Sequence, residues 1–187
     1  MSLINVSNLT FGYDGAFDNV FENVSFQIDT DWRLGFVGRN GRGKTTFFKL
    51  LMNEFEYSGK ISSNVNFIIS YVPQSTDGLC GSISDLAYEK GIDESLFRTV
   101  LSKLDFSREQ LEKNIEHFSE GQKKKVLLAE SLCTPAHLYV WDEPLNYIDV
   151  ISRIQLENLL KKFSLTIIFV EHDKTFSDSI ATKIIEI

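Results

Sequence analysis

The pattern of apolar and polar residues predicts both strands and helices along the chain. Partial alternation in residues 1–11 and 20–29 predicts two half-exposed antiparallel strands joined by a turn. Further strands are predicted from short, mostly apolar runs at 32–37, 59–62, 65–72, 138–141, 165–170 and 182–187. Helices are predicted where apolar residues recur three and four positions apart, at 46–52, 83–90, 94–104, 108–115, 123–133 and 151–163. The segments 59–62 and 65–72 are expected to pair with each other, and Pro73 ends the second.

The order of these elements predicts the domain organisation. Strand-like runs vanish between residues 75 and 118, where short amphipathic helices are expected, with Asp93 and Ser107 as N-caps. We therefore expect a single domain, residues 1–187, whose core of 1–74 and 119–187 carries a helical subdomain of 75–118. The fold class is α/β, with an antiparallel β subdomain at the N-terminus and a mostly parallel sheet after it.

The composition is that of an ordinary globular protein. Of 187 residues, 43% are hydrophobic and 24% charged, which is enough apolar material for a real core. The net charge of −7 argues against general adhesion to nucleic acid or anionic membrane, so direct DNA binding is not expected. Cys80 and Cys133 lack metal or redox spacing and are expected to be buried free thiols. The apolar runs are strand-sized and the N-terminus lacks signal-peptide features, so we expect a cytoplasmic location.

The most informative stretch is Gly38-Arg39-Asn40-Gly41-Arg42-Gly43-Lys44-Thr45, which fits the phosphate-loop pattern G-x-x-x-x-G-K-[ST]. A predicted buried strand precedes it and a predicted helix follows it, as the motif requires. Glycines let backbone N–H groups turn toward phosphate oxygens, and the helix N-terminus adds partial positive charge. Lys44 is expected to reach the β- and γ-phosphates, and the Thr45 hydroxyl to bind Mg²⁺. The expected nucleotide contacts on this segment are Gly38, Asn40, Gly41, Gly43, Lys44, Thr45 and Thr46.

Two adjacent carboxylates follow the apolar run at 138–141. In a nucleotide-binding α/β sheet, ligands lie beyond the carboxyl ends of the strands, so Asp142 is placed to hold Mg²⁺ opposite Thr45. Glu143 is placed to accept a proton from the attacking water. A single carboxylate at a strand end is commonly only a helix cap. Two of them, in a chain with a phosphate loop, favour the metal and base assignment.

Other polar and aromatic residues have alternative interpretations. His172 leaves the strand 165–170 at the same expected edge, which favours a γ-phosphate contact over a purely structural role. Tyr13 is either a core or hairpin aromatic, the commoner case, or a platform that stacks on a nucleotide base. The lysines at 123–125 stand in the first turn of a predicted helix, where cations oppose the helix dipole unless an anion is near. A solvated basic face is expected for at least two of them.

Six elements in this order resemble the ATP-binding cassette (ABC) ATPases over nearly the whole chain. They are the phosphate loop, the glutamine loop at Gln74, the signature loop Phe118-Ser119-Glu120-Gly121-Gln122, the pair Asp142-Glu143, the aspartate loop at 146–149 and the switch histidine His172. Tyr13 matches the aromatic that stacks on adenine. The resemblance implies a P-loop NTPase core that binds ATP and Mg²⁺ and hydrolyses ATP to ADP and phosphate. It gives Gln74, Glu143 and His172 catalytic roles and places the metal at Thr45, Gln74 and Asp142.

The resemblance also implies a head-to-tail pair of cassettes, formed with a second copy or with a partner domain. Ser119 and the Gly121 backbone of one cassette would donate to the γ-phosphate held by the other, an anion that the three lysines would also face. The chain departs from the family at Glu120, where glycine is usual. A carboxylate so near a triphosphate is expected to weaken closure unless it points away or pairs with a lysine.

Within the family, the sequence most resembles the ABC-F class, whose members carry two cassettes, lack membrane domains and act on ribosomes. Residues 141–149 and 171–173 resemble the second cassette of its antibiotic-resistance subgroup, and 32–46 its first. This predicts a join after Leu51, through an internal deletion or in a natural one-cassette protein. An excised piece of a longer protein is the other alternative.

Three functions follow as hypotheses. The first is a ribosome-associated ATPase, an antibiotic-resistance or translation factor. The second is the ATP-binding subunit of a membrane transporter, since the charged helical linker of the ABC-F class is absent from the sequence. The third is a module that closes on ATP but scarcely hydrolyses it.

Overall fold

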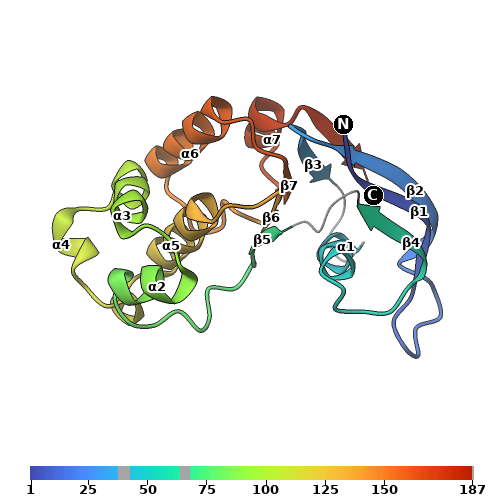
Figure 1. Ribbon diagram of the computed structural model, residues 1–187, viewed down its shortest axis with the longest axis horizontal. Coiled ribbons are helices and arrows are strands. Elements are labelled where there is room, and N and C mark those ends of the chain that lie inside the picture. The colour runs from blue at the N-terminus through green and yellow to red at the C-terminus, as the bar shows by residue number, and fades with distance from the viewer. Residues whose placement is uncertain (38–42, 64–67, 187) are drawn as a thin grey trace.

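The computed structural model describes residues 1–37, 43–63 and 68–186, which form two β-sheets with most of the helices at one end (Figure 1). The strands are β1 (Ser2–Phe11), β2 (Phe21–Asp29), β3 (Arg33–Val37), β4 (Ser58–Ser63), β5 (Ile69–Val72), β6 (Leu138–Asp142), β7 (Ile167–Val170) and β8 (Lys183–Glu186). The helices are α1 (Lys44–Leu51), α2 (Ile83–Lys90), α3 (Glu94–Lys103), α4 (Arg108–Leu111), the 3₁₀ helix η1 (Ile115–His117), α5 (Glu120–Cys133), α6 (Val150–Lys162) and α7 (Lys174–Ile180).

The N-terminal sheet is antiparallel, in the order β2-β1-β4. Val6 of β1 lies opposite Phe26 of β2 and Ile61 of β4. Within β1, Ile4 and Val6 are buried while Asn5 between them is exposed. The prediction of half-exposed antiparallel strands from this alternation is therefore confirmed for β1 and β2.

The second sheet has the order β5-β6-β7-β3-β8, and all of its pairs are parallel. β5 joins it with Val72 opposite Trp141. The prediction that 59–62 and 65–72 pair with each other is therefore wrong, since β4 and β5 belong to different sheets; residues 65–67 lie outside the described part. None of the four residues of β5 is exposed, which fits a parallel sheet with both faces covered better than a hairpin with one face in water.

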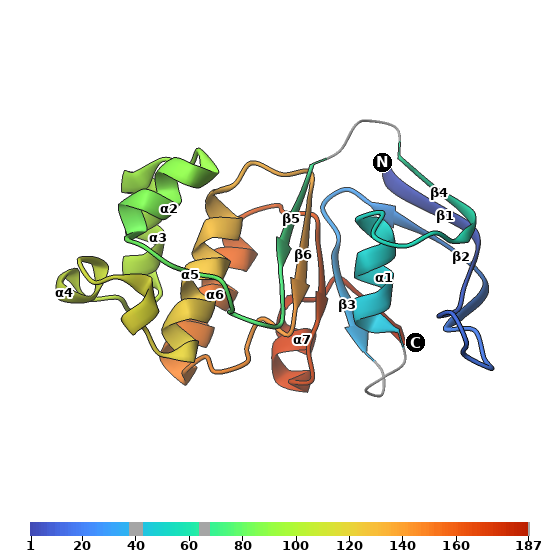
Figure 2. The ribbon, with the colours of Figure 1, turned by 90° about the horizontal axis from the view of Figure 1, so that it is seen from below.

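Helix α1 lies between the two sheets, next to β3 (Figure 2). Its side chains Phe47, Phe48 and Leu50 are buried in the same apolar cluster as β1 and β3. The central strands β6 and β7 have both faces covered, because their alternate residues enter two clusters. In β6, Val140 packs with α1 and the N-terminal sheet, and Trp141 packs with α5 and α6. This sandwich holds the start of α1 against the strand ends.

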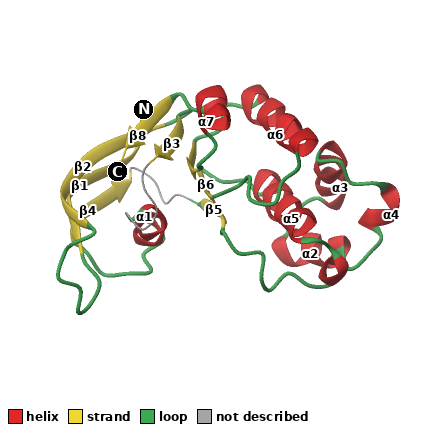
Figure 3. Ribbon diagram, turned by 180° about the vertical axis from the view of Figure 1, so that it is seen from behind, coloured by secondary structure: helices red, strands yellow, loops and turns green. Residues whose placement is uncertain are grey.

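Helices alone occupy residues 75–118, and they lie at the end of the molecule away from the antiparallel sheet (Figure 3). The predicted helix 108–115 is wrong in length. Its first turn, α4, is followed by a bond from the Lys113 N–H to the Gln110 carbonyl, and the Ile115 N–H donates to Gly81 instead of continuing the helix. The division into a subdomain at 75–118 stays a prediction.

Three smaller expectations need correction. The predicted helix 123–133 begins at Glu120, because Ser119 caps it. The short helix α7, capped by Asp173, was not predicted. Cys133 is a buried free thiol as expected, but Cys80 is exposed. In the described part of the chain, no helix has both the length and the apolarity needed to cross a membrane.

Candidate nucleotide-binding site

The end of the phosphate loop is set by a tight approach of β2 to α1. Gly43 precedes α1 with a φ of 91°, a left-handed conformation that favours glycine. A Cβ at this position would also overlap the side chain of Val20. Lys44 and Thr45 then form the first turn of α1, as the motif predicts. The predicted contacts Gly38, Asn40 and Gly41 lie outside the described residues.

A cleft of about 470 Å³ opens beside the start of α1. It is lined by Tyr13 from the turn after β1, by the end of the phosphate loop and the start of α1, and by residues at the carboxyl ends of β5, β6 and β7. These residues are Tyr13, Gly43, Lys44, Thr45, Thr46, Gln74, Asp142, Glu143 and Val170. The structure therefore brings together, at one sheet edge, residues that the sequence placed there from separate motifs. A cleft of this size is typical of a small-ligand site.

The Thr45 hydroxyl donates to Asp142 Oδ2 at 2.7 Å, which joins the phosphate loop to the end of β6. Asp142 is buried, with a relative exposure of 1%. Burial raises the pKa of its carboxyl, an effect that the Thr45 hydrogen bond opposes and the negative charge of Glu143 reinforces. A hydroxyl and a buried carboxylate in contact are oxygen donors of the kind that Mg²⁺ prefers. The residues present therefore fit a magnesium site.

Glu143 is held by side chains from three other positions. Its Oε2 accepts a hydrogen bond from Gln74 Nε2 at 2.8 Å and one from Asn146 Nδ2 at 2.5 Å. Its Oε1 lies 3.3 Å from His172 Nε2. The backbone of Glu143 has a φ of 49°, a conformation that costs a non-glycine residue about 1–3 kcal/mol. Asn146, which the sequence identified only as the start of the aspartate loop, thus belongs to the carboxylate's surroundings.

Tyr13 lies at the mouth of the cleft. Its hydroxyl is 2.8 Å from Thr46 Oγ1, and its ring makes edge contacts with Phe11 and Phe55. The side chain is nevertheless 45% exposed. The ring is therefore fixed in a hairpin cluster and still presents surface to the cleft, so its stacking on a base stays a prediction.

The signature loop packs against the aspartate loop of its own chain and not against the candidate cleft. Ser119 caps α5, accepting from the Gln122 N–H at 3.3 Å, while Gln122 Oε1 accepts from the Ser119 N–H at 3.0 Å. At Gly121 a Cβ would overlap the backbone oxygen of Tyr147 in the aspartate loop, so only glycine fits. Within the described residues, neither Ser119 nor Gly121 lines the cleft.

Glu120 points toward the glutamine loop of its own chain. The Thr76 hydroxyl donates to Glu120 Oε2, and Lys123 Nζ lies 3.3 Å from Oε1. The hydrogen bond from Thr76, followed by that from Lys123, lowers the pKa of the Glu120 carboxyl. The carboxylate is thus paired with a lysine, one of the two conditions under which it is compatible with cassette closure.

The expectation that at least two of the three lysines form a solvated face is wrong, because two of them are buried. Lys124 has a relative exposure of 0%, and Lys125, whose Nζ lies 2.7 Å from Asp149 Oδ2, is also buried. Burial lowers the pKa of Lys124 to about 8, against the attraction of nearby carboxylates. The reason is helical spacing, since Lys124 lies on the same buried face of α5 as Leu128 and Ser131, four and seven positions later. That helical spacing is the signal by which its burial was predictable.

Sequence reasoning also missed the role of Glu171. Its side chain is buried, and Oε2 accepts from the Leu145 N–H at 3.0 Å. Oε1 accepts from the His172 N–H at 2.8 Å and the Asp173 N–H at 3.2 Å. Glu171 therefore joins the aspartate loop to the segment that carries His172.

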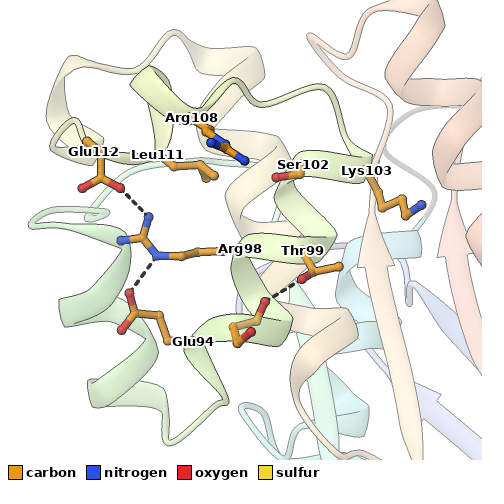
Figure 4. Close-up of a pocket in the computed structure, with 9 residues that line it drawn as sticks. Glu94, Arg98, Thr99, Ser102, Lys103, Arg108, Leu111 and Glu112 are labelled. Atoms are coloured by element: carbon orange, nitrogen blue, oxygen red, sulfur yellow. Dashed lines mark hydrogen bonds and ion pairs between the residues drawn. The ribbon is translucent and has the colours of Figure 1, made fainter.

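A larger cleft, of about 860 Å³, lies between α3 and α4 (Figure 4). Arg98 crosses it and pairs with Glu94 at 2.7 Å and Glu112 at 2.8 Å. The charge of Arg98 in this cleft is therefore neutralised by the two glutamates, and the lining of the cleft includes none of the motif residues. The smaller cleft is the candidate functional site.

A parallel sheet with a phosphate loop after β3 and paired carboxylates after β6 defines the class of P-loop NTPases. The ABC transporter family matches residues 21–146, and the chain belongs to this family of ATPase domains. It is 31% identical to the Probable ATP-binding protein YbiT of Escherichia coli O157:H7, over 98% of this chain and 36% of that protein. It is 34% identical to the ATP-binding protein Uup of Caulobacter vibrioides, over 89% of this chain and 29% of that protein.

An ABC transporter F family member also matches. The chain is 28% identical to F family member 2 of Arabidopsis thaliana, over 100% of this chain and 28% of that protein. The predicted resemblance to the ABC-F class is therefore confirmed. The chain spans 28–36% of the length of these three relatives.

Solved structures confirm the predicted fold class. A metal-chelate type ABC transporter in an inward-facing conformation matches with a TM-score of 0.79 and 23% identity, over 99% of this chain and 79% of that chain. The ATP-binding cassette MJ0796, as a dimer bound to ADP and phosphate, matches with a TM-score of 0.85 and 16% identity, over 99% and 94%.

Proposed function

We propose that this chain binds Mg-ATP in the cleft beside α1 and hydrolyses it to ADP and phosphate. The observation that carries the proposal is the position of Glu143. Its carboxylate is held by Gln74, Asn146 and His172, directly beside the contact between Thr45 and Asp142. This arrangement has a base, a group for the γ-phosphate and a metal-binding pair at one sheet edge.

In the proposed mechanism each residue has a separate task. Lys44 and the phosphate-loop backbone hold the β- and γ-phosphates. Thr45, Asp142 and Gln74 would hold Mg²⁺, and the ion would supply positive charge to neutralise the phosphates. Glu143 polarises the attacking water and accepts its proton, and His172 stabilises the γ-phosphate as charge develops. The two hydrogen bonds at Oε2 fix the carboxylate and leave Oε1 facing His172.

We also propose that two cassettes close head to tail, either two copies of this chain or this chain and a partner domain. Ser119 and Gly121 do not line the cleft of their own chain in the described structure, which fits a role at the cleft of another. The similarity in fold to the dimeric MJ0796 cassette supports the same arrangement. Ser119 at the N-terminus of α5 would then donate to the γ-phosphate held by the second cassette.

For the biological role we propose ATP-driven closure on the ribosome, as an antibiotic-resistance or translation factor. The F family relative supports this proposal. The alternative is the ATP-binding subunit of a membrane transporter, which the similarity in fold to a transporter chain supports.

Nucleotide binding is tested by calorimetric titration of the Lys44→Ala variant with Mg-ATP. Loss of the ammonium that reaches the phosphates is expected to abolish measurable binding. Lys103→Ala, which removes an exposed lysine from α3, is the matched control and is expected to bind normally. Undiminished affinity in Lys44→Ala would refute the assignment of the site.

ATP hydrolysis and the proposed binding to the ribosome are both tested with Glu143→Gln. Phosphate release is expected to stop in this variant and to continue in Glu89→Gln, which changes an exposed carboxylate on α2. The Glu143→Gln protein is then sedimented with ribosomes, with and without Mg-ATP. Pelleting that depends on Mg-ATP supports the ribosomal role, whereas equal pelleting in both conditions would exclude it in favour of the transporter alternative.

A further inference from the structure

We propose that Lys124 is a positioning residue for the ATP site, whose buried ammonium group fixes the backbone at Gln74 and Asp142. The proposal rests on the proposed ATPase function. Lys124 is not among the described residues that line the cleft, so it acts through other residues rather than on the nucleotide.

The ammonium group has three backbone acceptors. Lys124 Nζ lies 2.7 Å from the Pro73 oxygen, 3.2 Å from the Asp142 oxygen and 3.4 Å from the Gln74 oxygen. An ammonium group carries three donors and no acceptor, so these contacts match its full capacity. Its relative exposure of 0% means that water does not replace them.

These acceptors lie where the ladder between β5 and β6 ends. Val72 and Trp141 form the final pair of that ladder, and Pro73 and Asp142 follow them directly. Beyond this pair one segment continues to Gln74 and the other to Glu143, whose side chains meet at 2.8 Å. A side chain from α5 thus joins two strand ends that no ladder hydrogen bond holds together beyond Trp141 in the described structure.

The fixed backbone carries side chains of the site. Gln74 reaches Glu143 Oε2 at 2.8 Å, and Asp142 accepts from Thr45 at 2.7 Å. Both side chains extend from peptide units that Lys124 contacts. A displacement of about 1 Å in such a group lowers a reaction rate by about a hundredfold. The ammonium group therefore controls the geometry of catalysis without touching the substrate.

Packing alone does not require a charge at this position. An apolar side chain of similar length would fill the space between α5 and the strand ends without the desolvation of an ammonium group. The charge strengthens the hydrogen bonds to the three carbonyl oxygens, and the carboxylates of Asp142 and Glu143 attract it to the same place. A positioning role thus accounts for both the burial of Lys124 and its charge.

The test compares Lys124→Met, which keeps the length without donors, with Lys124→Gln, which keeps a neutral donor. Lys113→Met, an exposed lysine after α4, is the control. We expect Lys124→Met to lower kcat for ATP hydrolysis by about a hundredfold. KM for ATP should stay nearly unchanged, kcat of Lys124→Gln should be intermediate, and both variants should need more Mg²⁺ for half-maximal rate. If Lys124→Met does not fold, Lys124→Gln carries the same comparison.

A merely structural role would lower the folded fraction and leave kcat per ATP-binding site unchanged, which would overturn the proposal. A loss confined to KM would also overturn it. If the wild-type chain binds ATP but does not hydrolyse it under any condition, the proposed function fails and the positioning role fails with it. An active wild type with equally active Lys124 variants removes the positioning role alone.

Discussion

Asp149 joins the aspartate loop to α5, and its removal should destabilise the fold measurably. Its Oδ1 accepts from the Ser152 N–H at 2.8 Å, which caps α6, and its Oδ2 lies 2.7 Å from Lys125 Nζ. Asp149→Ala removes both interactions, together with the 2.9 Å hydrogen bond that Oδ2 accepts from the Ser152 hydroxyl. Asp149→Asn keeps a good cap and removes the charge that pairs with Lys125, so the two variants separate the two contributions.

The expected magnitudes follow from these contacts. Loss of an N-cap costs about 1 kcal/mol. The side chain of Asp149 is 49% exposed, so solvent screens the ion pair, while that of Lys125 is only 8% exposed and is left without its carboxylate. We assign about 1 kcal/mol to the pair, the upper end for exposed ion pairs. The expected loss in the free energy of unfolding is therefore about 1 kcal/mol for Asp149→Asn and about 2 kcal/mol for Asp149→Ala.

The charge contribution should also depend on pH. Burial acts to raise the pKa of Asp149, but the hydrogen bonds from Lys125 and Ser152 outweigh it and hold the pKa below its usual value. A carboxyl whose pKa is lower in the folded state stabilises fully above its unfolded pKa of about 3.9, and this stabilisation is lost as the pH falls further. The difference between wild type and Asp149→Asn should therefore be constant from about pH 8 to 5 and shrink below about pH 4.

The assay is equilibrium unfolding in urea without nucleotide, followed by tryptophan fluorescence at each pH. Asp178→Asn, an exposed position on α7, is the control for loss of a negative charge. Equal losses for Asp149→Asn and Asp149→Ala would refute the capping argument. A difference that persists undiminished below pH 4 would refute the ion-pair argument.

Three further changes have definite expected outcomes. Glu120 is turned toward Thr76 of its own chain, so Glu120→Gln should have little effect on ATP-dependent dimerisation of a hydrolysis-deficient variant. Sedimentation should show a change of no more than about twofold in the dimerisation constant, and a large gain would contradict this orientation. Trp141→Phe removes a buried indole hydrogen bond and leaves a cavity, so the free energy of unfolding in urea should fall by about 2–3 kcal/mol. A fall of less than about 1 kcal/mol would be incompatible with the full burial of Trp141. Tyr13→Ala should weaken ATP binding by about tenfold in calorimetry, as expected for loss of base stacking, with Tyr13→Phe close to wild type; equal affinities in all three proteins would remove the stacking role.

The site was predictable because its residues follow strands whose ends meet by a general rule. Asp142 and Gln74 come directly after or near the end of an apolar run, and parallel strands bring such positions to one edge. The contact of Thr45 with Asp142 across 97 residues is therefore implied by local patterns alone. The prediction required only that the strands belong to a parallel sheet, which places their carboxyl ends at one edge.

Other features depend on tertiary structure that local sequence does not encode. β4 and β5 are both short runs after α1, and nothing in their residues tells which sheet each joins. The helical spacing of Lys124 with Leu128 and Ser131 indicates that Lys124 is buried, but it does not indicate what its ammonium group contacts. Its partners are backbone oxygens 51, 50 and 18 positions away, and backbone oxygens carry no sequence signal.

The strand order of the parallel sheet has a consequence for how the protein folds during its synthesis. β3, which leads into the phosphate loop, has β7 and β8 as its two neighbours, so Arg33 lies opposite Ile167 and Leu34 opposite Lys183. During synthesis, chains emerge N-terminus first, and contacts over such separations form late because they close long loops. β3, which leads into the phosphate loop, therefore has neither neighbouring strand until well over a hundred further residues have been synthesised. A ligand that binds only the finished site stabilises only chains that have completed the sheet, so ATP would favour the mature molecule over its partly made forms.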